Sequence, residues 1–416
     1  MTFTCGCSRR DFLRKGFYGL GVGAGLPVIL NRTSAALAAQ ALGGTSLETN
    51  PERILVVVEL SGGNDGLNTV VPYGNDTYYQ VRPNLGIPEH DVLKVESGYG
   101  FHPALVGFER LYKDGQMAVV HGCGYENPSL SHFSSMGYWH SGVPNGGDPL
   151  GWVGRLADRA YDHDAQGNMI VNIGTRQSMA VQSRYHPPLV FSDPGRLRRD
   201  GTGDELDALA ALSPEVTSAN QALEFLTSTA QNATESGELV REATSSYHTP
   251  VDYGIGGLSG SLRQTAALIA AQLPTRLYYV SYSGNSFDTH VHQADPHARL
   301  LAYTADAVHG FIEDMRRIGR ADDVAVMMFT EFGRRVEENA SLGTDHGTAT
   351  PMFVLGAGVN GGMYGRHPSL TDLDDGNLKM TTDFRRVYAT MIDEWLGHAD
   401  TQAILKGSFE PMGLFA

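Results

Sequence analysis

The chain has 416 residues, 41% of them hydrophobic, and a formal net charge of −15, so it is long enough to bury a large core. The excess of acidic residues argues against nucleic acid and against an anionic membrane surface as partners. It has three cysteines. Cys5 and Cys7 lie near the start, so Cys123 would be the one thiol of a processed chain, which leaves no intramolecular disulfide.

The first 41 residues have a composition of their own. Arg9 and Arg10 open a basic segment, the stretch 16–30 carries no charge, and small residues gather at 35–41. This arrangement resembles a twin-arginine export signal with an Ala-x-Ala cleavage site. The uncharged stretch is shorter than the roughly 20 apolar residues that a spanning helix needs. We therefore predict export by the twin-arginine machinery, a periplasmic or extracellular location, and no stable membrane span after cleavage.

Residues 51–416 alternate strand and helix patterns, which predicts an α/β domain. A continuous apolar run stopped by glycines opens it, as in a strand covered on both faces by helices. The residue composition and helical spacing of residues 193–273 predict a mainly helical insertion. The strands are predicted at 53–60, 116–121, 276–281, 324–329 and 351–355, and the helices at 101–113, from a loop at 127–133 to Trp139, and at 295–318. We expect a mostly parallel central sheet sandwiched by helices.

Two candidate residues stand in the first half of the domain. Asp65 follows the first strand, where it could hold a metal or form an Asx turn in the Gly-rich loop. Ser131 precedes a predicted helix start, where free backbone N–H groups favour an anion. A plain N-cap role for Ser129 or Ser131 is the alternative. No G-x-S-x-G motif surrounds these serines, so an esterase of the α/β-hydrolase type is not indicated.

The last third of the chain holds carboxylate and imidazole groups near predicted strand ends. Oxygen and nitrogen donors together suit a divalent metal, Zn or Mn first, with Ca or Mg as further candidates. His290 and His292 lie two and four residues after Asp288, and either could share an ion with it. The candidate metal ligands are Asp65, Asp288, His290, His292, Glu331, Asp345 and His346.

Arg334 follows the strand-ending Glu331 and could act in two ways. It could pair with Glu331 structurally, or bind a substrate oxyanion bidentately as a catalytic residue. The spacing leaves both open.

The order of these motifs resembles the exported DUF1501 family. The resemblance covers nearly the whole chain through S-G-G-N-D-G-L-N at 61–68, S-H-F at 131–133, F-D-T-H at 287–290, T-E-F-G-R-R at 330–335, G-T-D-H-G-T-A at 343–349 and D-F-R-R-V-Y at 383–388. That family is similar to the alkaline phosphatase and sulfatase superfamily, which implies metal ions and a nucleophile above a parallel sheet.

The resemblance implies a role for each matching residue. It places the first metal carboxylate on Asp65, the nucleophile on Ser131, and the middle ligands on Asp288 with His290 or His292. In one alignment, the superfamily's late Asp-His pair falls on Asp345 and His346. In a second alignment, Glu331 occupies the position of that pair and His346 that of the superfamily's final histidine. The number of metals stays open. The sulfatase signature C-x-P-S-R is absent, because Gly-Tyr-Glu follows Cys123.

These observations predict an exported, metal-dependent hydrolase of phosphoric esters, in preference to sulfuric esters, with Ser131 as nucleophile. Its substrate would be a small-molecule or polymer ester. The alternative is a non-catalytic exported binding or assembly protein that keeps the phosphatase-like fold.

Overall fold

The computed structural model describes residues 53–163, 168–197, 236–282 and 284–415. Residues 45–196 and 239–416 form one compact unit, which is described below. A second unit comprises 1–44 and 197–238, and nearly all of it lies outside the described residues. The predicted export signal and much of the predicted helical insertion therefore remain predictions.

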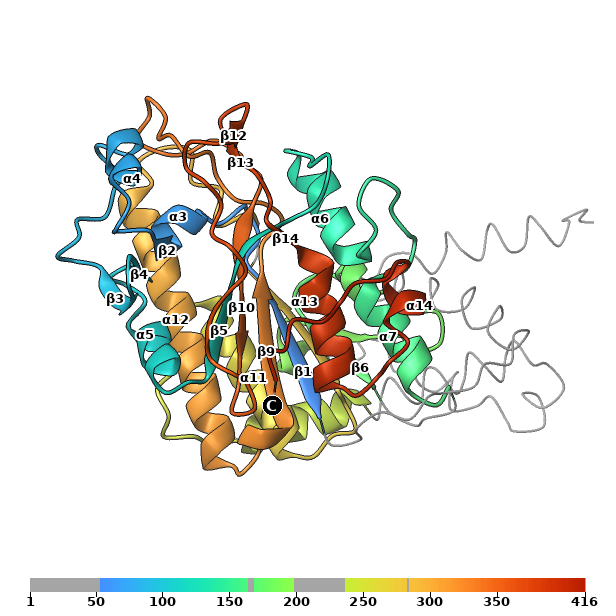
Figure 1. Ribbon diagram of the computed structural model, residues 1–416. Coiled ribbons are helices and arrows are strands. Elements are labelled where there is room, and N and C mark those ends of the chain that lie inside the picture. The colour runs from blue at the N-terminus through green and yellow to red at the C-terminus, as the bar shows by residue number, and fades with distance from the viewer. Residues whose placement is uncertain (1–52, 164–167, 198–235, 283, 416) are drawn as a thin grey trace, which may run out of the picture. The chain divides into compact units, whose positions relative to one another are not determined.

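A large central sheet runs through this unit (Figure 1). Its strand order is β11-β5-β10-β9-β1-β8-β6-β7, and β14 also pairs with β5. All pairings are parallel except those of β10 with β5 and β9. The strands are β1 (Ile54–Glu59), β5 (Met117–Gly124), β6 (Ile170–Ile173), β7 (Leu189–Phe191), β8 (Leu277–Ser281), β9 (Val324–Phe329), β10 (Thr350–Leu355), β11 (Gly362–Tyr364) and β14 (Thr382–Asp383). The predicted α/β class with a mostly parallel central sheet is confirmed.

Strand β1 shows why the interior of this sheet forms. All six of its residues, Ile-Leu-Val-Val-Val-Glu, are buried. Branched apolar side chains fit a pleated surface, and burial on both faces removes the need for polar alternation.

Strand β10 is the exception to the parallel arrangement, because it runs antiparallel to its neighbours. A parallel neighbour of β9 would need a crossover, usually a helix. The 20 residues between β9 and β10, 330–349, contain no helix and stay at the carboxyl edge. The chain therefore re-enters the sheet from that edge, and both ends of this loop lie beside the ends of the parallel strands.

Helices cover both faces of the sheet (Figure 1). One layer holds α5 (Val106–Lys113), α11 (Gly257–Ala270) and α12 (Ala294–Arg317), and the other holds α6 (His132–Ser141), α7 (Trp152–Ala160), α13 (Phe384–Thr390) and α14 (Thr401–Leu405). In α12, Asp295 lies in the first turn and Arg316 and Arg317 in the last, which complements the helix dipole.

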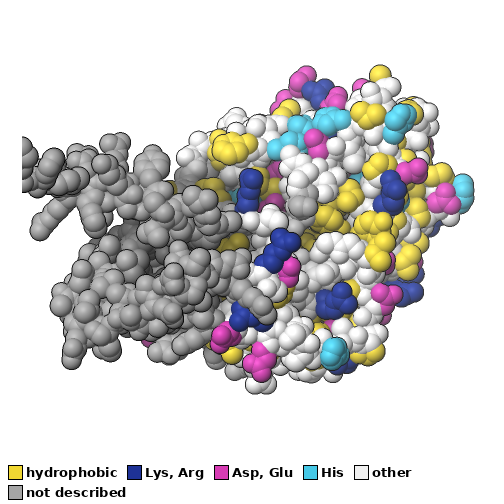
Figure 2. Space-filling model, turned by 180° about the vertical axis from the view of Figure 1, so that it is seen from behind, with side chains coloured by type: hydrophobic (Ala, Val, Ile, Leu, Met, Phe, Trp, Pro, Cys, Tyr) yellow, Lys and Arg dark blue, Asp and Glu magenta, His cyan; other side chains and the backbone are white. Residues whose placement is uncertain are grey.

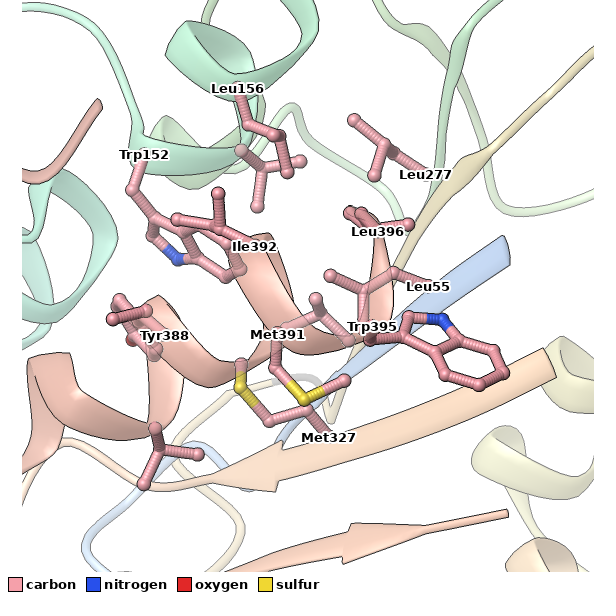
Figure 3. Close-up of a cluster of buried hydrophobic side chains, with 14 of the residues drawn as sticks. Leu55, Trp152, Leu156, Leu277, Met327, Tyr388, Met391, Ile392, Trp395 and Leu396 are labelled. Carbon is pink, nitrogen blue, oxygen red and sulfur yellow. The ribbon is translucent and has the colours of Figure 1, made fainter. Parts of the chain in front are cut away.

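The larger hydrophobic core lies between the sheet and the second helix layer (Figure 3). Leu55, Leu277 and Met327 of the strands pack against Trp152 of α7 and Tyr388 of α13, and the last two rings stack with centroids 4.3 Å apart. Cys123 is fully buried in β5, as expected, and burial raises the pKa of its thiol.

Several short elements had no clear sequence signal. They comprise the three-stranded sheet β2 (Val70–Val71), β4 (Tyr99–Phe101) and β3 (Leu93–Glu96), the pair β12 (Leu373–Asp374) and β13 (Asn377–Leu378), α3 (Gly66–Thr69), α4 (Asp76–Val81), and the single turns η1 (Met179–Val181), η2 (Pro194–Arg196), η3 (Ala321–Asp323) and η4 (Met391–Trp395). The predicted helix at 101–113 begins only at Val106, because Phe101 pairs in β4. Among the described residues, no helix is long and apolar enough to cross a bilayer.

Candidate metal centre

The register of three parallel strands brings their following loops together. Glu59, the last residue of β1, lies opposite Phe329 of β9 and Ser281 of β8. The chain then continues into Gly62, Glu331 and Asp288 respectively. Because these strands end level, the three loops meet at the carboxyl edge, where ligand sites of open α/β sheets form.

The loop 330–349 folds back on itself and fixes His346. Gly333 N–H donates to Thr348 O at 2.8 Å, and Gly347 N–H donates to Gly333 O at 2.9 Å. Arg334 and His346 are paired in an antiparallel bridge. A Cβ on Gly347 would lie 2.4 Å from the Arg334 carbonyl carbon, so the close approach needs glycine there.

Three side chains from separate segments form the centre. His132, Asp288 and His346 each offer an atom within 4.8 Å of the others, a group that could hold a metal ion. Asp288 Oδ2 lies 3.3 Å from His132 Nε2, and Asp288 Oδ1 lies 3.2 Å from His346 Nε2. His290 joins them, because its Nε2 is 3.0 Å from both Asp288 Oδ1 and His346 Nε2.

Each imidazole is anchored through its Nδ1. His132 Nδ1 lies 2.7 Å from Glu331 Oε1, His346 Nδ1 2.7 Å from the Leu130 carbonyl oxygen, and His290 Nδ1 3.2 Å from Asp345 Oδ1. Each partner can only accept, so a neutral ring carries its proton on Nδ1 and presents a lone pair at Nε2. This is how protein carboxylates and carbonyls orient metal-binding histidines.

The Nε2 atoms then need a cation. His132 Nε2 is buried and makes no hydrogen bond, although a carboxylate oxygen is near. Its bond to Glu331 raises the pKa of His132, so a proton could occupy this one ring. Protonating all three rings beside Arg334 would gather four positive charges around Asp288. One divalent ion satisfies the three lone pairs together, and the mixed N and O donors suit it.

Arg334 holds Asp288 in place. Its guanidinium is fully buried, and its Nη2 donates to Asp288 Oδ1 at 2.6 Å. Its other bonds go to the carbonyls of Gly62, Gly63, Phe287 and Thr344 and to His290 Nε2. Burial alone would raise the pKa of Asp288, but the hydrogen bond and charge of Arg334 lower it. Every nitrogen of Arg334 is engaged, so it does not present the free fork expected for oxyanion binding.

Glu331 and Asp345 lie behind the histidines. The Glu331 carboxylate is completely buried and accepts from the N–H groups of Gly62 and Gly63 as well as from His132. Asp345 is exposed and accepts from Asn339 Nδ2 at 3.0 Å in addition to His290. Each carboxylate orients a histidine from this position.

Asp65 and His292 lie apart from this group. Asp65 is fully buried, forms a 2.5 Å ion pair with Arg82, accepts from Gln293, and caps α3. Burial opposes ionisation, but Arg82 outweighs it and lowers the pKa of Asp65. His292 is exposed at a turn with a φ of 45°. The structure therefore brings together five of the seven predicted ligands and gives Asp65 a structural partner instead.

Ser131 lies at the start of α6, directly before His132 in the sequence. It is the N-cap residue by position, but its side chain makes no capping hydrogen bond and is exposed. The neighbouring Ser135, by contrast, is buried and bonded to Tyr125 and to the Glu331 carbonyl. His132 was not among the predicted ligands, although it directly follows Ser131 in S-H-F.

A cavity of about 320 Å³ opens beside the centre. Glu331 and Phe332 line it, together with Tyr125, Trp139 and Met380. The Phe332 ring also contacts His132 and His346, with centroids 4.9 and 4.8 Å away. Phe332 and Glu331 thus both line the cavity and contact a histidine of the centre.

The family model described as "Protein of unknown function (DUF1501)" matches residues 52–407. The chain belongs to the DUF1501 family. This DUF1501 protein matches no curated protein in a sequence comparison. The sequence resemblance to the family is thereby confirmed.

Three solved structures are similar to this DUF1501 protein at low identity. The PsFucS1 sulfatase from Pseudoalteromonas sp. is 11% identical, with a TM-score of 0.38, covering 94% of this chain and 75% of that one. The phosphonate monoester hydrolase of Agrobacterium radiobacter is 11% identical, with a TM-score of 0.36 and coverages of 87% and 79%. An alkaline phosphatase superfamily protein from Vibrio parahaemolyticus is 9% identical, with a TM-score of 0.34 and coverages of 81% and 70%.

Proposed function

We propose that this DUF1501 protein is an exported, metal-dependent hydrolase of phosphoric esters, with sulfuric esters as second choice. One observation carries the proposal: three imidazole Nε2 atoms converge on the Asp288 carboxylate, and each ring is anchored through Nδ1. His132, Asp288, His290 and His346 would hold the ion.

The donor set favours zinc. Nitrogen outnumbers oxygen in it, whereas Ca²⁺ and Mg²⁺ prefer all-oxygen sites. A bound divalent ion supplies a Lewis acid that stabilises negative charge on an ester and lowers the pKa of a hydroxyl. Arg334 would keep Asp288 ionised and positioned, while Glu331 and Asp345 hold the tautomers of His132 and His290.

Ser131 is the proposed nucleophile. Its hydroxyl is exposed, makes no capping bond, and directly precedes His132. Its Oγ would bond to phosphorus as the bond to the alcohol oxygen breaks; the hydroxyl proton passes to solvent, and the leaving alcohol takes a proton from solvent. Water then releases phosphate and restores the serine. The free N–H groups and dipole at the start of α6 favour the anionic phosphoryl group nearby.

A non-catalytic binding role is the second candidate. The full engagement of Arg334 favours it, because the Arg334 guanidinium is not left to hold a phosphate. A metal site without turnover would fit a protein that binds an anionic ligand and keeps it.

Elemental analysis of purified protein tests the proposal. We expect about one equivalent of zinc in the wild type and in His292→Ala, and strong loss in His132→Ala and His346→Ala. A zinc-loaded screen of phosphate and sulfate monoesters follows, in which Ser131→Ala abolishes turnover and Ser134→Ala, one turn into the helix, retains it. Equal zinc in all four proteins would refute the centre. Zinc without turnover would favour the binding role.

A further inference from the structure

Several exposed apolar side chains lie on the segments that carry the candidate metal ligands. Among the described residues, seven large hydrophobic side chains are exposed. Four of them are Leu130 at 38%, Phe133 at 91%, Val291 at 57% and Leu342 at 38%. Scattered exposed apolar residues are ordinary, but a group beside a concave polar site marks binding. We call these four residues the apolar rim.

The rim residues belong to the segments that carry the metal ligands. The Leu130 carbonyl oxygen accepts a hydrogen bond from His346 Nδ1 at 2.7 Å. Phe133 follows His132, and Val291 follows His290. The segment of Leu342 lies against that of His290, because Gln293 N–H donates to Leu342 O at 2.8 Å and a Cβ on Gly343 would lie 2.2 Å from the His290 carbonyl carbon. The backbone that carries the rim residues is therefore held by the same segments that hold the candidate ligands.

The ligands themselves are open to solvent inside this rim. The side chains of Asp288, His290 and His346 are 23 to 38% exposed. Figure 2 shows histidine and hydrophobic side chains together along the upper edge of the molecule. A ligand at the Nε2 atoms would therefore bind on the same segments that expose the rim side chains.

We propose that the rim binds the apolar part of an amphiphilic monoester, whose anionic head lies at the metal centre. This inference rests on the proposed function, since it names the class of ester. Charge complementarity selects the head, because a metal-loaded centre attracts an anion. The net charge of −15 argues for single amphiphile molecules rather than the surface of an anionic bilayer.

The test measures binding without turnover. Calorimetry compares n-octylphosphonic acid with ethylphosphonic acid on zinc-loaded protein, two ligands with the same head that differ by six methylene groups. We expect the octyl compound to bind about tenfold more tightly, since even partial burial of those groups adds free energy of this size. Phe133→Ser should reduce that ratio about threefold or more. The control Ile255→Ser removes an apolar side chain that is 67% exposed outside the rim and should leave the ratio unchanged.

The outcomes separate this inference from the proposed function. Equal affinities for the two phosphonates, an unchanged ratio in Phe133→Ser, or an equal loss in Ile255→Ser would overturn the apolar rim. If the ratios behave as expected but no monoester is hydrolysed, the rim stands as a ligand site and the hydrolase assignment fails. If short monoesters such as ethyl phosphate are hydrolysed as well as octyl phosphate, the enzyme assignment stands and the amphiphile assignment fails.

Discussion

Replacing Glu331 by glutamine should weaken metal binding through His132. The Glu331 carboxylate accepts from His132 Nδ1 at 2.7 Å, Gly62 N at 2.9 Å and Gly63 N at 3.0 Å. Thr330 Oγ1 also lies 2.9 Å from it, but its single hydrogen is shared with Leu60 O. An amide has one acceptor oxygen and one donor group. If that oxygen serves His132 and Gly62, the amide NH₂ faces the N–H of Gly63.

The magnitude follows from this geometry. Thr330 can accept from the new NH₂ while it keeps its bond to Leu60 O at 2.7 Å, so one buried N–H of Gly63 loses its acceptor. That orphaned donor lowers the free energy of unfolding by about 1–3 kcal/mol. His132 also loses the negative charge that raises its pKa. Loss of such a carboxylate behind a metal-binding histidine weakens metal affinity by about 10–100-fold.

Competition with a chromophoric chelator near neutral pH measures the zinc affinity, and urea unfolding of the metal-free proteins measures stability. Glu338→Gln is the control, because Glu338 lies in the same loop and binds Asn84 and Leu85 rather than a histidine. A zinc affinity for Glu331→Gln within twofold of the wild type, in fully folded protein, would refute the orienting role of Glu331.

Further predictions concern residues on either side of the centre. His290→Ala should weaken zinc binding about tenfold or more, as loss of a group beside the ion would, while chelator competition finds His292→Ala unchanged. Asp65→Ala should lower the free energy of unfolding by about 3–5 kcal/mol, because it leaves Arg82 buried without its partner; denaturation measures this, and a loss of zinc in the folded variant would restore Asp65 as a ligand. Burial lowers the pKa of His297 to about 3, so between the ordinary histidine pKa near 6.5 and pH 3 the unfolded chain binds the extra proton and folding weakens as pH falls. His297 contributes up to about 1.4 kcal/mol per pH unit to the slope of the free energy of unfolding against pH. Urea titrations across that range should show a smaller slope in His297→Gln.

Much of the fold follows from local patterns. The run Ile54–Glu59 has five branched apolar residues before its final glutamate, and Val324–Phe329 is apolar throughout, so each is expected to form a buried strand from its own composition. The helix Ala294–Arg317 has its own apolar face and end charges. Strand β10 could not be oriented in this way, because its direction depends on a loop without a helix and not on its own residues.

For the candidate site too, one part follows from the sequence and another part depends on the tertiary structure. The residues themselves determined that oxygen and nitrogen donors stand at strand ends, among them Asp288 and His346, because ligand chemistry depends on side-chain type. Only the tertiary structure placed His290 rather than His292 beside Asp288, brought His132 to Asp288 across 156 positions of the chain, and paired Asp65 with Arg82. Those outcomes depend on contacts between segments that are far apart in the sequence. Spacing along a single chain does not tell which distant side chain will contact a given carboxylate.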